Sequence, residues 1–194
     1  MGCLPRALAQ EFSPKITKGH IVLDGQSRQD GKSLVNLREA TALTLREAAM
    51  DQGGTDLIYA YGKSTGVNLL TPSSPGNKFF TAYKGTVFEH WKVKNKGVLI
   101  ALGNAKEIRK TFKKLKKGED VKKAYDRAAR TVMLREDYKK GRHGPAGRIQ
   151  RLEIGDHFLI RSKGRKFYAM GRVVNQEGGF SGTLAIDLKI AKYE

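Results

Sequence analysis

A single cysteine, Cys3, is present in the 194 residues. One thiol excludes an intramolecular disulfide and any zinc site built from several cysteines. The four histidines (His20, His90, His143 and His157) do not occur at the spacings typical of metal ligands, so we expect neither a metal nor another cofactor. No serine–histidine–aspartate order and no catalytic pair of carboxylates is apparent. The sequence therefore predicts no catalytic residues and a protein that is not an enzyme.

Long apolar runs are missing too. No segment is long enough to cross a bilayer as a helix. Residues 4–12 are too short for a signal peptide and are interrupted by Pro5, Arg6 and Gln10. The Met-Gly-Cys start lacks the serine or threonine at position 6 that the myristoylation pattern requires. We therefore expect no membrane partner.

Acidic residues are scarce relative to basic ones. The chain has 37 Lys and Arg against 19 Asp and Glu, which gives a formal net charge of +18. Proteins this basic usually bind a polyanion, such as DNA, RNA or an acidic membrane surface, and charge alone does not select among these. The length suits one domain, or one domain with an extension, and the hydrophobic share of 39% is enough for a packed core.

The basic residues concentrate between residues 104 and 151. Asn104 and Glu107 have capping-box spacing, which predicts a helix N-terminus at Asn104. An apolar stripe at helical spacing follows, and Gly118 interrupts it. Lysines followed by a glycine at 139–141 predict the helix end. The pattern indicates an amphipathic helical hairpin, or one long helix bent at Gly118. Its stripe consists of Ile108, Phe112, Leu115, Val121, Ala124, Ala128 and Val132.

Like charges cover the other face of this segment. Balanced Lys/Glu pairs four residues apart would be expected if the charges served helix stability alone, whereas like charges at that spacing repel. We therefore predict a surface that contacts nucleic-acid phosphates; the alternative is a solvated face that only keeps the protein soluble. The candidate binding residues are Lys106, Lys110, Lys113, Lys114, Lys117, Lys122, Lys123, Arg127, Arg130, Arg142 and Arg148.

Residues 24–33 share features with a phosphate-binding P-loop, because an apolar segment precedes them and they end in Gly-Lys-Ser. That motif needs four residues between its two glycines, whereas five separate Gly25 from Gly31. We therefore predict a polar surface turn that leads into a helix. Leucines and alanines at helical spacing place this helix at residues 33–51.

The other segments are mainly extended. The aromatic residues between 59 and 91 can pack in the core or stack on bases, and core packing is the expectation. A β-meander begins at residue 149, with a break or bulge near Gly171. Strands are predicted at 20–23, 57–61, 67–70, 98–102, 151–154, 157–161, 166–174 and 184–190, with a further strand pair within 79–91.

These elements predict an α+β fold, in which an antiparallel β-sheet or small barrel packs with an N-terminal helix and a long basic helix or helical hairpin. Residues 1–19 are expected to form an arm, since prolines and a glycine prevent a long helix. Residues 20–103 form an α+β region, and residues 104–194 combine the basic hairpin with the β-meander. The last two regions can also form one domain.

Residues 104–194 resemble the tail-completion proteins of tailed bacteriophages, which join the head–tail connector to the tail tube. The matching stretches are 104–110, 124–133, the Pro/Gly turn 144–149 and the strands after it. The family usually places this block near its N-terminus, and its turn carries a Thr-Gly step that is missing here. The resemblance implies a non-enzymatic ring component of the virion neck, a homo-oligomer with other virion subunits as partners, whose positive lumen faces DNA. The protein would reside in the virion or in the host cytoplasm.

Two other functions fit the same residues. The first is a free-standing, sequence-nonspecific RNA- or DNA-binding protein associated with the ribosome or the nucleoid. The second is a small basic nuclease or toxin. In that case His143, in the basic stretch 141–144, would act as general base, and Arg142 or Arg148 would hold the scissile phosphate. The simpler interpretation of His143 is an exposed loop histidine without a catalytic role.

Overall fold

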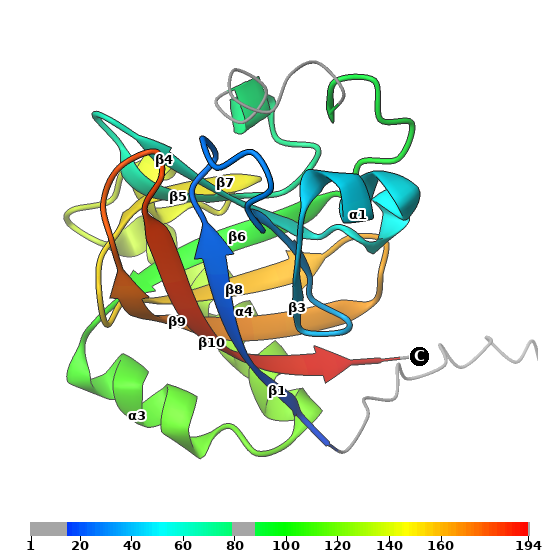
Figure 1. The fold of residues 1–194 in the computed structure, drawn as a ribbon. Helices are drawn as coiled ribbons and strands as arrows, with labels where there is room; N and C mark the ends of the chain where they lie inside the picture. Colours follow the sequence, from blue (N-terminus) through cyan, green and yellow to red (C-terminus); the bar gives the residue numbers. More distant parts are fainter. Residues whose placement is uncertain (1–14, 79–87, 194) are drawn as a thin grey trace, which may run out of the picture.

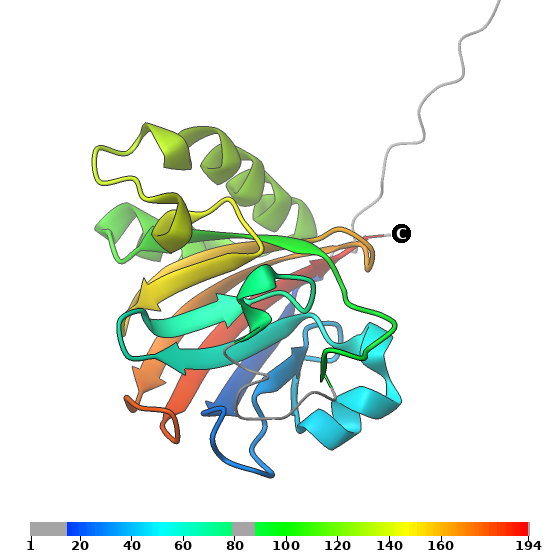
Figure 2. The same cartoon turned by 90° about the horizontal axis from the view of Figure 1, so that it is seen from above.

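The computed structural model describes residues 15–78 and 88–193. Two five-stranded antiparallel sheets pack face to face, and helices lie on their outer sides (Figures 1 and 2). The fold is therefore α+β, as the sequence predicts. The sheet arrangement differs from the expected single sheet or small barrel, because the described strands form two separate sheets that do not close into a barrel.

The first sheet has the strand order β1-β10-β9-β8-β6. Its last three strands in sequence pair consecutively, so this part of the predicted β-meander is confirmed. Side chains of β10 alternate between buried and half-buried positions, as expected for a strand with one face in the core. The bounds are β1 (Thr17–Asp24), β6 (Gly97–Gly103), β8 (His157–Ser162), β9 (Phe167–Gln176) and β10 (Thr183–Lys192).

The second sheet has the order β3-β2-β4-β5-β7. Strand β7 was expected to open the meander but pairs with β5 instead, because the turn at 153–156 redirects the chain to the other sheet. The first sheet thus combines strands from before and after the basic segment, and in the second sheet β7, at the end of that segment, joins four strands that precede it. The bounds are β2 (Leu34–Asn36), β3 (Thr41–Leu43), β4 (Leu57–Gly62), β5 (Gly66–Leu70) and β7 (Arg148–Leu152).

The helix predicted over 33–51 is wrong. Residues 34–43 form the hairpin β2–β3, and helix α1 (Leu45–Met50) is all that is helical. Its N-cap is Thr44, whose hydroxyl accepts the N–H of Glu47 at 3.2 Å. Val35 pairs with Leu57 of β4, so tertiary strand pairing overrides the helix propensity of this segment. Consequently the loop 24–33 leads into a strand and not into a helix, and it lacks the strand–turn–helix order of a P-loop.

Among the remaining helical segments, α4 is the longest, with 14 residues. Helices α3 (Lys106–Lys114) and α4 (Gly118–Thr131) lie against the outer face of the first sheet (Figures 1 and 2). Helix α5 (Lys140–His143) packs beside β7. The 3-10 turns are η1 (Gln52–Gly54), η2 (Pro75–Asn77) and η4 (Val132–Leu134).

Apolar side chains fill three layers. The largest cluster lies between the two sheets, the second between the first sheet and α3 and α4, and the third between the second sheet and α1. Tyr59, Phe88 and Trp91 are buried in these layers, which confirms core packing for them. Residues 88–91 form a turn, and the rest of the strand pair expected within 79–91 falls outside the described residues. Of the predicted arm, residues 17–19 belong to β1 and residues 1–14 are not described.

A polar cluster links the two sheets at one end. The guanidinium of Arg165, in the turn between β8 and β9, donates to Asp56 Oδ2 and to the carbonyl of Gly54, both at 2.6 Å. Asp56 Oδ2 also accepts the N–H of Leu37 at 2.9 Å. The Asp56 side chain is 2% exposed, and burial raises its pKa to about 7, against the opposing effects of Arg165 and the Leu37 N–H. Arg165 therefore compensates a carboxyl that water does not reach.

Candidate nucleic-acid interface

The candidate interface is carried by α3 and α4, which are two separate helices. Leu115 and Lys117 have extended backbone angles, so the chain breaks between the helices just before Gly118. The predicted cap at Asn104 is wrong. The N-cap is Ala105, and the Asn104 side chain instead accepts from the guanidinium of Arg109 at 3.2 Å. Nor is 139–141 a helix end, since α4 ends at Thr131 and residues 140–141 begin α5.

The predicted apolar stripe faces the first sheet. Phe112, Leu115, Val121, Ala128 and Val132 are buried there, and Ile108 and Ala124 are partly buried against the same cluster. Tyr125 also belongs to this face, although the predicted stripe does not include it. It is 4% exposed, with the guanidinium of Arg161 5.7 Å from its ring centroid. Its position four residues after Val121 is helical spacing, which indicates that Tyr125 lies on the same buried face.

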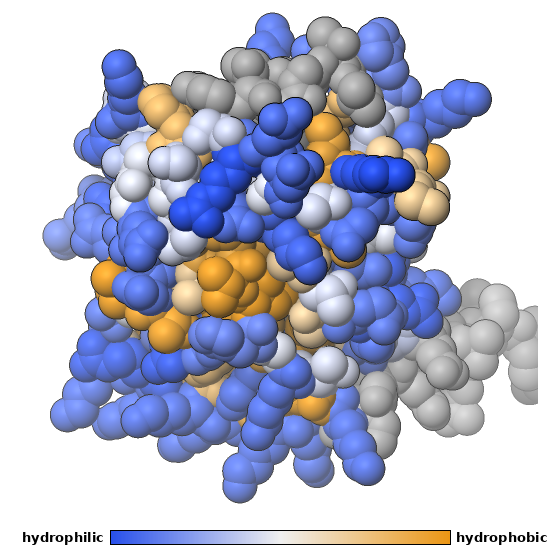
Figure 3. Space-filling view, in the orientation of Figure 1, coloured by the Kyte–Doolittle hydropathy of each residue, from blue (hydrophilic) through white to orange (hydrophobic). Residues whose placement is uncertain are grey.

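Along α3 and in the turn that follows it, five candidate lysines are exposed: Lys106, Lys110, Lys113, Lys114 and Lys117. Within the described residues none of them lies within 4.0 Å of a carboxylate oxygen. The segment 106–135 contains twelve Lys and Arg but only four Asp and Glu. In Figure 3 the surface over α3 is largely hydrophilic. The positive charge on this side is therefore open to solvent.

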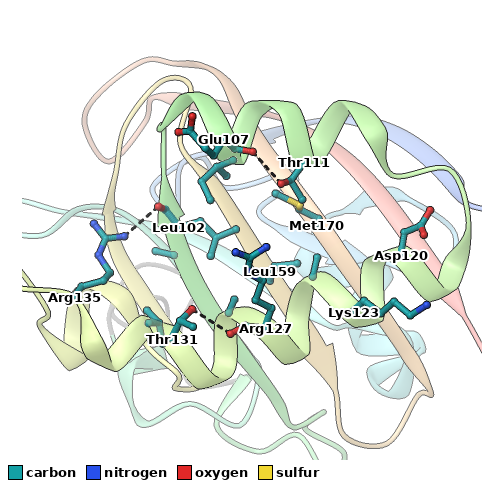
Figure 4. A pocket seen from close by; sticks show the side chains of 15 residues that line it. Leu102, Glu107, Thr111, Asp120, Lys123, Arg127, Thr131, Arg135, Leu159 and Met170 are labelled. Atoms are coloured by element: carbon teal, nitrogen blue, oxygen red, sulfur yellow. Dashed lines mark hydrogen bonds between the residues drawn. The ribbon is translucent and has the colours of Figure 1, made fainter.

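The candidate residues of α4 are in more varied settings. Lys122 pairs with Asp126, and Lys123 with Glu119 at 3.4 Å. Arg130 is exposed. The side chain of Arg127 extends over a pocket between the two helices (Figure 4). Helix α4 thus contributes less unpaired charge to the outer surface than the sequence predicts.

Arg142 and Arg148 lie elsewhere, on α5 and β7. Arg148 is half-buried and donates to Asn68 Oδ1 at 3.0 Å and to Gln150 Oε1 at 2.8 Å, which ties β7 to β5. Burial lowers the pKa of its guanidinium. The structure therefore does not bring these two arginines onto the α3–α4 surface, and Arg148 has a structural role in the second sheet.

His143 is buried, and its expected exposure is wrong. Its side chain is 4% exposed, and burial lowers the pKa of the imidazole. Nδ1 accepts the N–H of Lys139 at 3.0 Å, which assigns the ring proton to Nε2, 3.7 Å from Asp137 Oδ2. Since Nδ1 is occupied and Nε2 carries the proton, neither nitrogen is placed to take a proton from a substrate.

Lys189 of β10 holds the C-terminus of α3. Its ammonium donates to the carbonyls of Phe112 at 2.6 Å and Leu115 at 2.9 Å, and lies 5.0 Å from the centroid of the Phe112 ring. Burial lowers the pKa of this amine. A cation at this end complements the helix dipole and the unpaired carbonyls, so Lys189 orients the helix that presents the exposed lysines.

Replacing Lys189 with methionine is expected to destabilise α3 by about 1 kcal/mol, because the terminal carbonyls lose their donor while the packing of the aliphatic stem is kept. Amide hydrogen exchange in α3 should then accelerate about fivefold relative to the amides of β8. The control is Lys192→Met at the end of the same strand, which should leave α3 unchanged. Unaltered exchange in α3 of the Lys189 variant would show that the helix does not depend on this contact.

The described residues contain no group of three or more His, Cys, Asp or Glu side chains arranged to hold a metal ion. None of the helices in this part of the chain has the length and apolar character needed to cross a membrane.

No protein-family model and no curated protein matches this sequence. The fold is similar to that of a solved structure, a DUF4466 family protein from Parabacteroides merdae ATCC 43184, with a TM-score of 0.51. The two chains are 11% identical, and the likeness covers 95% of this chain. The present chain spans 54% of that protein's length. At this identity the comparison supports the α+β fold alone.

Proposed function

We propose that the protein binds the phosphate backbone of a nucleic acid through α3 and the turn that follows it, as a non-enzymatic component of a nucleic-acid-containing assembly. The observation that carries the proposal is the row of exposed lysines at 106, 110, 113, 114 and 117, which have no carboxylate partner among the described residues. Several of them are three or four residues apart, where like charges repel. A bound polyanion removes this repulsion.

Phosphate neutralisation accounts for the binding without any base contact. Each lysine near a phosphate releases condensed counterions, so the affinity falls as salt increases and depends little on sequence. The apolar side chains of α3 face the sheet, and its outer surface offers mainly flexible ammonium groups. Such groups act as point charges and do not provide the planar, bidentate contacts that arginine makes with guanine.

The more specific version is a neck or tail-completion protein of a bacteriophage virion, in which copies of the chain form a ring around DNA. It is supported by the resemblance of residues 104–194 to that family. A free-standing RNA- or DNA-binding protein is the alternative, because the same lysines serve both. The nuclease version is less favoured, since His143 is buried with Nδ1 occupied.

The salt dependence of DNA binding tests the proposed surface. In the triple variant Lys110→Gln, Lys113→Gln and Lys117→Gln, the slope of log affinity against log salt should become less steep by about 2–3, because up to three phosphate contacts are lost. Two labelled duplexes of unrelated sequence, titrated by fluorescence anisotropy over a range of salt, should give the same change.

The matched control removes the same charge from exposed positions outside α3 and α4, with Lys63→Gln, Lys163→Gln and Lys166→Gln. Its slope should remain near that of the unmodified protein. Equal losses in both triple variants would mean that net charge alone drives the binding, and the α3 surface would then have no special role. Mass photometry separates the two versions, because a ring of fixed stoichiometry supports the neck protein and a monomer supports the free-standing binder.

A further inference from the structure

A pocket of about 500 Å³ opens between α3, α4 and the first sheet (Figure 4). Leu159 of β8 and Met170 of β9 form its floor, and Ile108 and Ala124 contribute to the helical walls. Within α3 only Phe112, near the C-terminal end, is fully buried, and Ile108 is partly buried. The side chains that α4 contributes include Ala124 and Ala128, which are small and leave space above the sheet.

Arg127 is the cation placed at this pocket. Figure 4 shows its side chain rising from α4 toward the middle of the cavity, beside Leu159. Its guanidinium makes no hydrogen bond or ion pair with a described residue. The neighbouring Arg135, by contrast, donates to the carbonyl of Leu102 at 3.1 Å and forms two hydrogen bonds with Asp137. Arg127 is thus the arginine at this pocket that is available to a ligand.

The acidic residues that line the pocket do not compensate Arg127. The Asp120 carboxylate accepts the backbone N–H groups of Lys116 at 3.1 Å and Lys117 at 2.9 Å, which lowers its pKa. In Figure 4 the carboxylate of Glu107 points away from the cavity. The site therefore combines an apolar floor with one unpaired guanidinium at the mouth.

We propose that this pocket binds a small amphipathic anion, a free carboxylic acid with an unbranched apolar chain. The chain would lie on Leu159 and Met170, and the carboxylate would pair with Arg127. A planar guanidinium matches the two oxygens of a carboxylate. A wholly apolar ligand would bury the Arg127 charge without a partner, and a wholly polar one would leave the floor unused. The volume lies within the range of about 300–1,000 Å³ usual for ligand pockets.

The proposal is tested with hexanoate, octanoate and decanoate, each titrated below the concentration at which it forms micelles, using isothermal calorimetry on the full chain. Affinity should rise about fourfold for each added methylene until the pocket is full, because each buried methylene adds a constant increment of transfer free energy. Decanol, which lacks the charge, should bind at least tenfold more weakly than decanoate. Equal affinity for the three acids would overturn the proposal.

Two variants and one control locate the site. Arg127→Gln should lower decanoate affinity at least tenfold, whereas Arg130→Gln, an exposed arginine on the same helix, should bind as the unmodified protein does. Ala124→Leu keeps the charge but fills the cavity and should also abolish binding, with the fold checked by circular dichroism. Unchanged binding in Arg127→Gln and Ala124→Leu would overturn the proposal, and so would binding only to vesicles of anionic lipid. The result of this ligand test does not depend on DNA binding, which is measured separately with the α3 lysine variant.

Discussion

Replacing Arg165 with methionine is expected to lower the free energy of unfolding by about 3–5 kcal/mol above about pH 7, where Asp56 is ionised, because removing one partner of a buried ion pair leaves an uncompensated charge. Arg165 is the partner of Asp56, whose side chain is 2% exposed, and it also donates to the carbonyl of Gly54. Chemical denaturation followed by tryptophan fluorescence measures the loss. Lys163→Met removes an exposed cation from the same turn and should change stability by less than about 0.5 kcal/mol.

The pH dependence identifies Asp56 as the origin of this loss. Its pKa in the folded protein, about 7, exceeds the unfolded value, so the stability that it contributes is greatest at low pH and falls as the pH rises through 7. Without Arg165 that pKa should rise further, and the deficit of the variant should grow above about pH 7. Asp56→Asn should remove the dependence. A deficit that is constant with pH would mean that Arg165 acts only through the neutral hydrogen bonds of the cluster.

Gly171→Ala is expected to destabilise the protein by about 1–3 kcal/mol through overpacking. Gly171 in β9 pairs with Phe158 in β8, and a Cβ at this position would overlap the Phe158 ring, which is fully buried. Neither strand can move away, since both are inner strands of the first sheet. Thermal or denaturant unfolding measures the effect.

A smaller side chain at position 158 should relieve the overlap. Phe158→Leu combined with Gly171→Ala should be more stable than the sum of the two single changes predicts, by about 1 kcal/mol or more. Gly164→Ala is the control, because a Cβ there meets no atom within 4 Å. Strictly additive losses would show that the glycine is required for backbone conformation and not for the Phe158 ring.

Strong alternation in the sequence was enough to predict the strands that it marks. β4, β6 and β10 lie within two residues of their predicted bounds, because each buries a nearly continuous or strictly alternating apolar face. The helix predicted over 33–51 is wrong because alanine and leucine suit a helix locally, whereas the strand pairing with β4 depends on residues outside the segment. β9 continues through Gly171 without a break, and the bulge that the sequence places near this glycine lies three residues further on, at Val174.

Part of the candidate interface could also be predicted from local periodicity. Helical spacing placed the apolar stripe on the sheet and the α3 lysines outside, since that depends on local periodicity. The burial of His143 and the pairing of Arg148 with Asn68 depend on contacts between distant segments, which composition does not encode. The pocket could not be predicted either, because its lining comes from two helices and three strands that lie far apart in the sequence.

The pairing of β1 with β10 has a consequence for how the chain folds. It places His20 beside Asp187, 167 residues later, with 2.8 Å between the imidazole and the carboxylate. The first sheet is complete only when β10 is in place, because β10 lies between β1 and β9 and pairs with both. Contacts of such long range slow folding, and until β10 docks, the open edge of β9 could pair with a strand of another molecule.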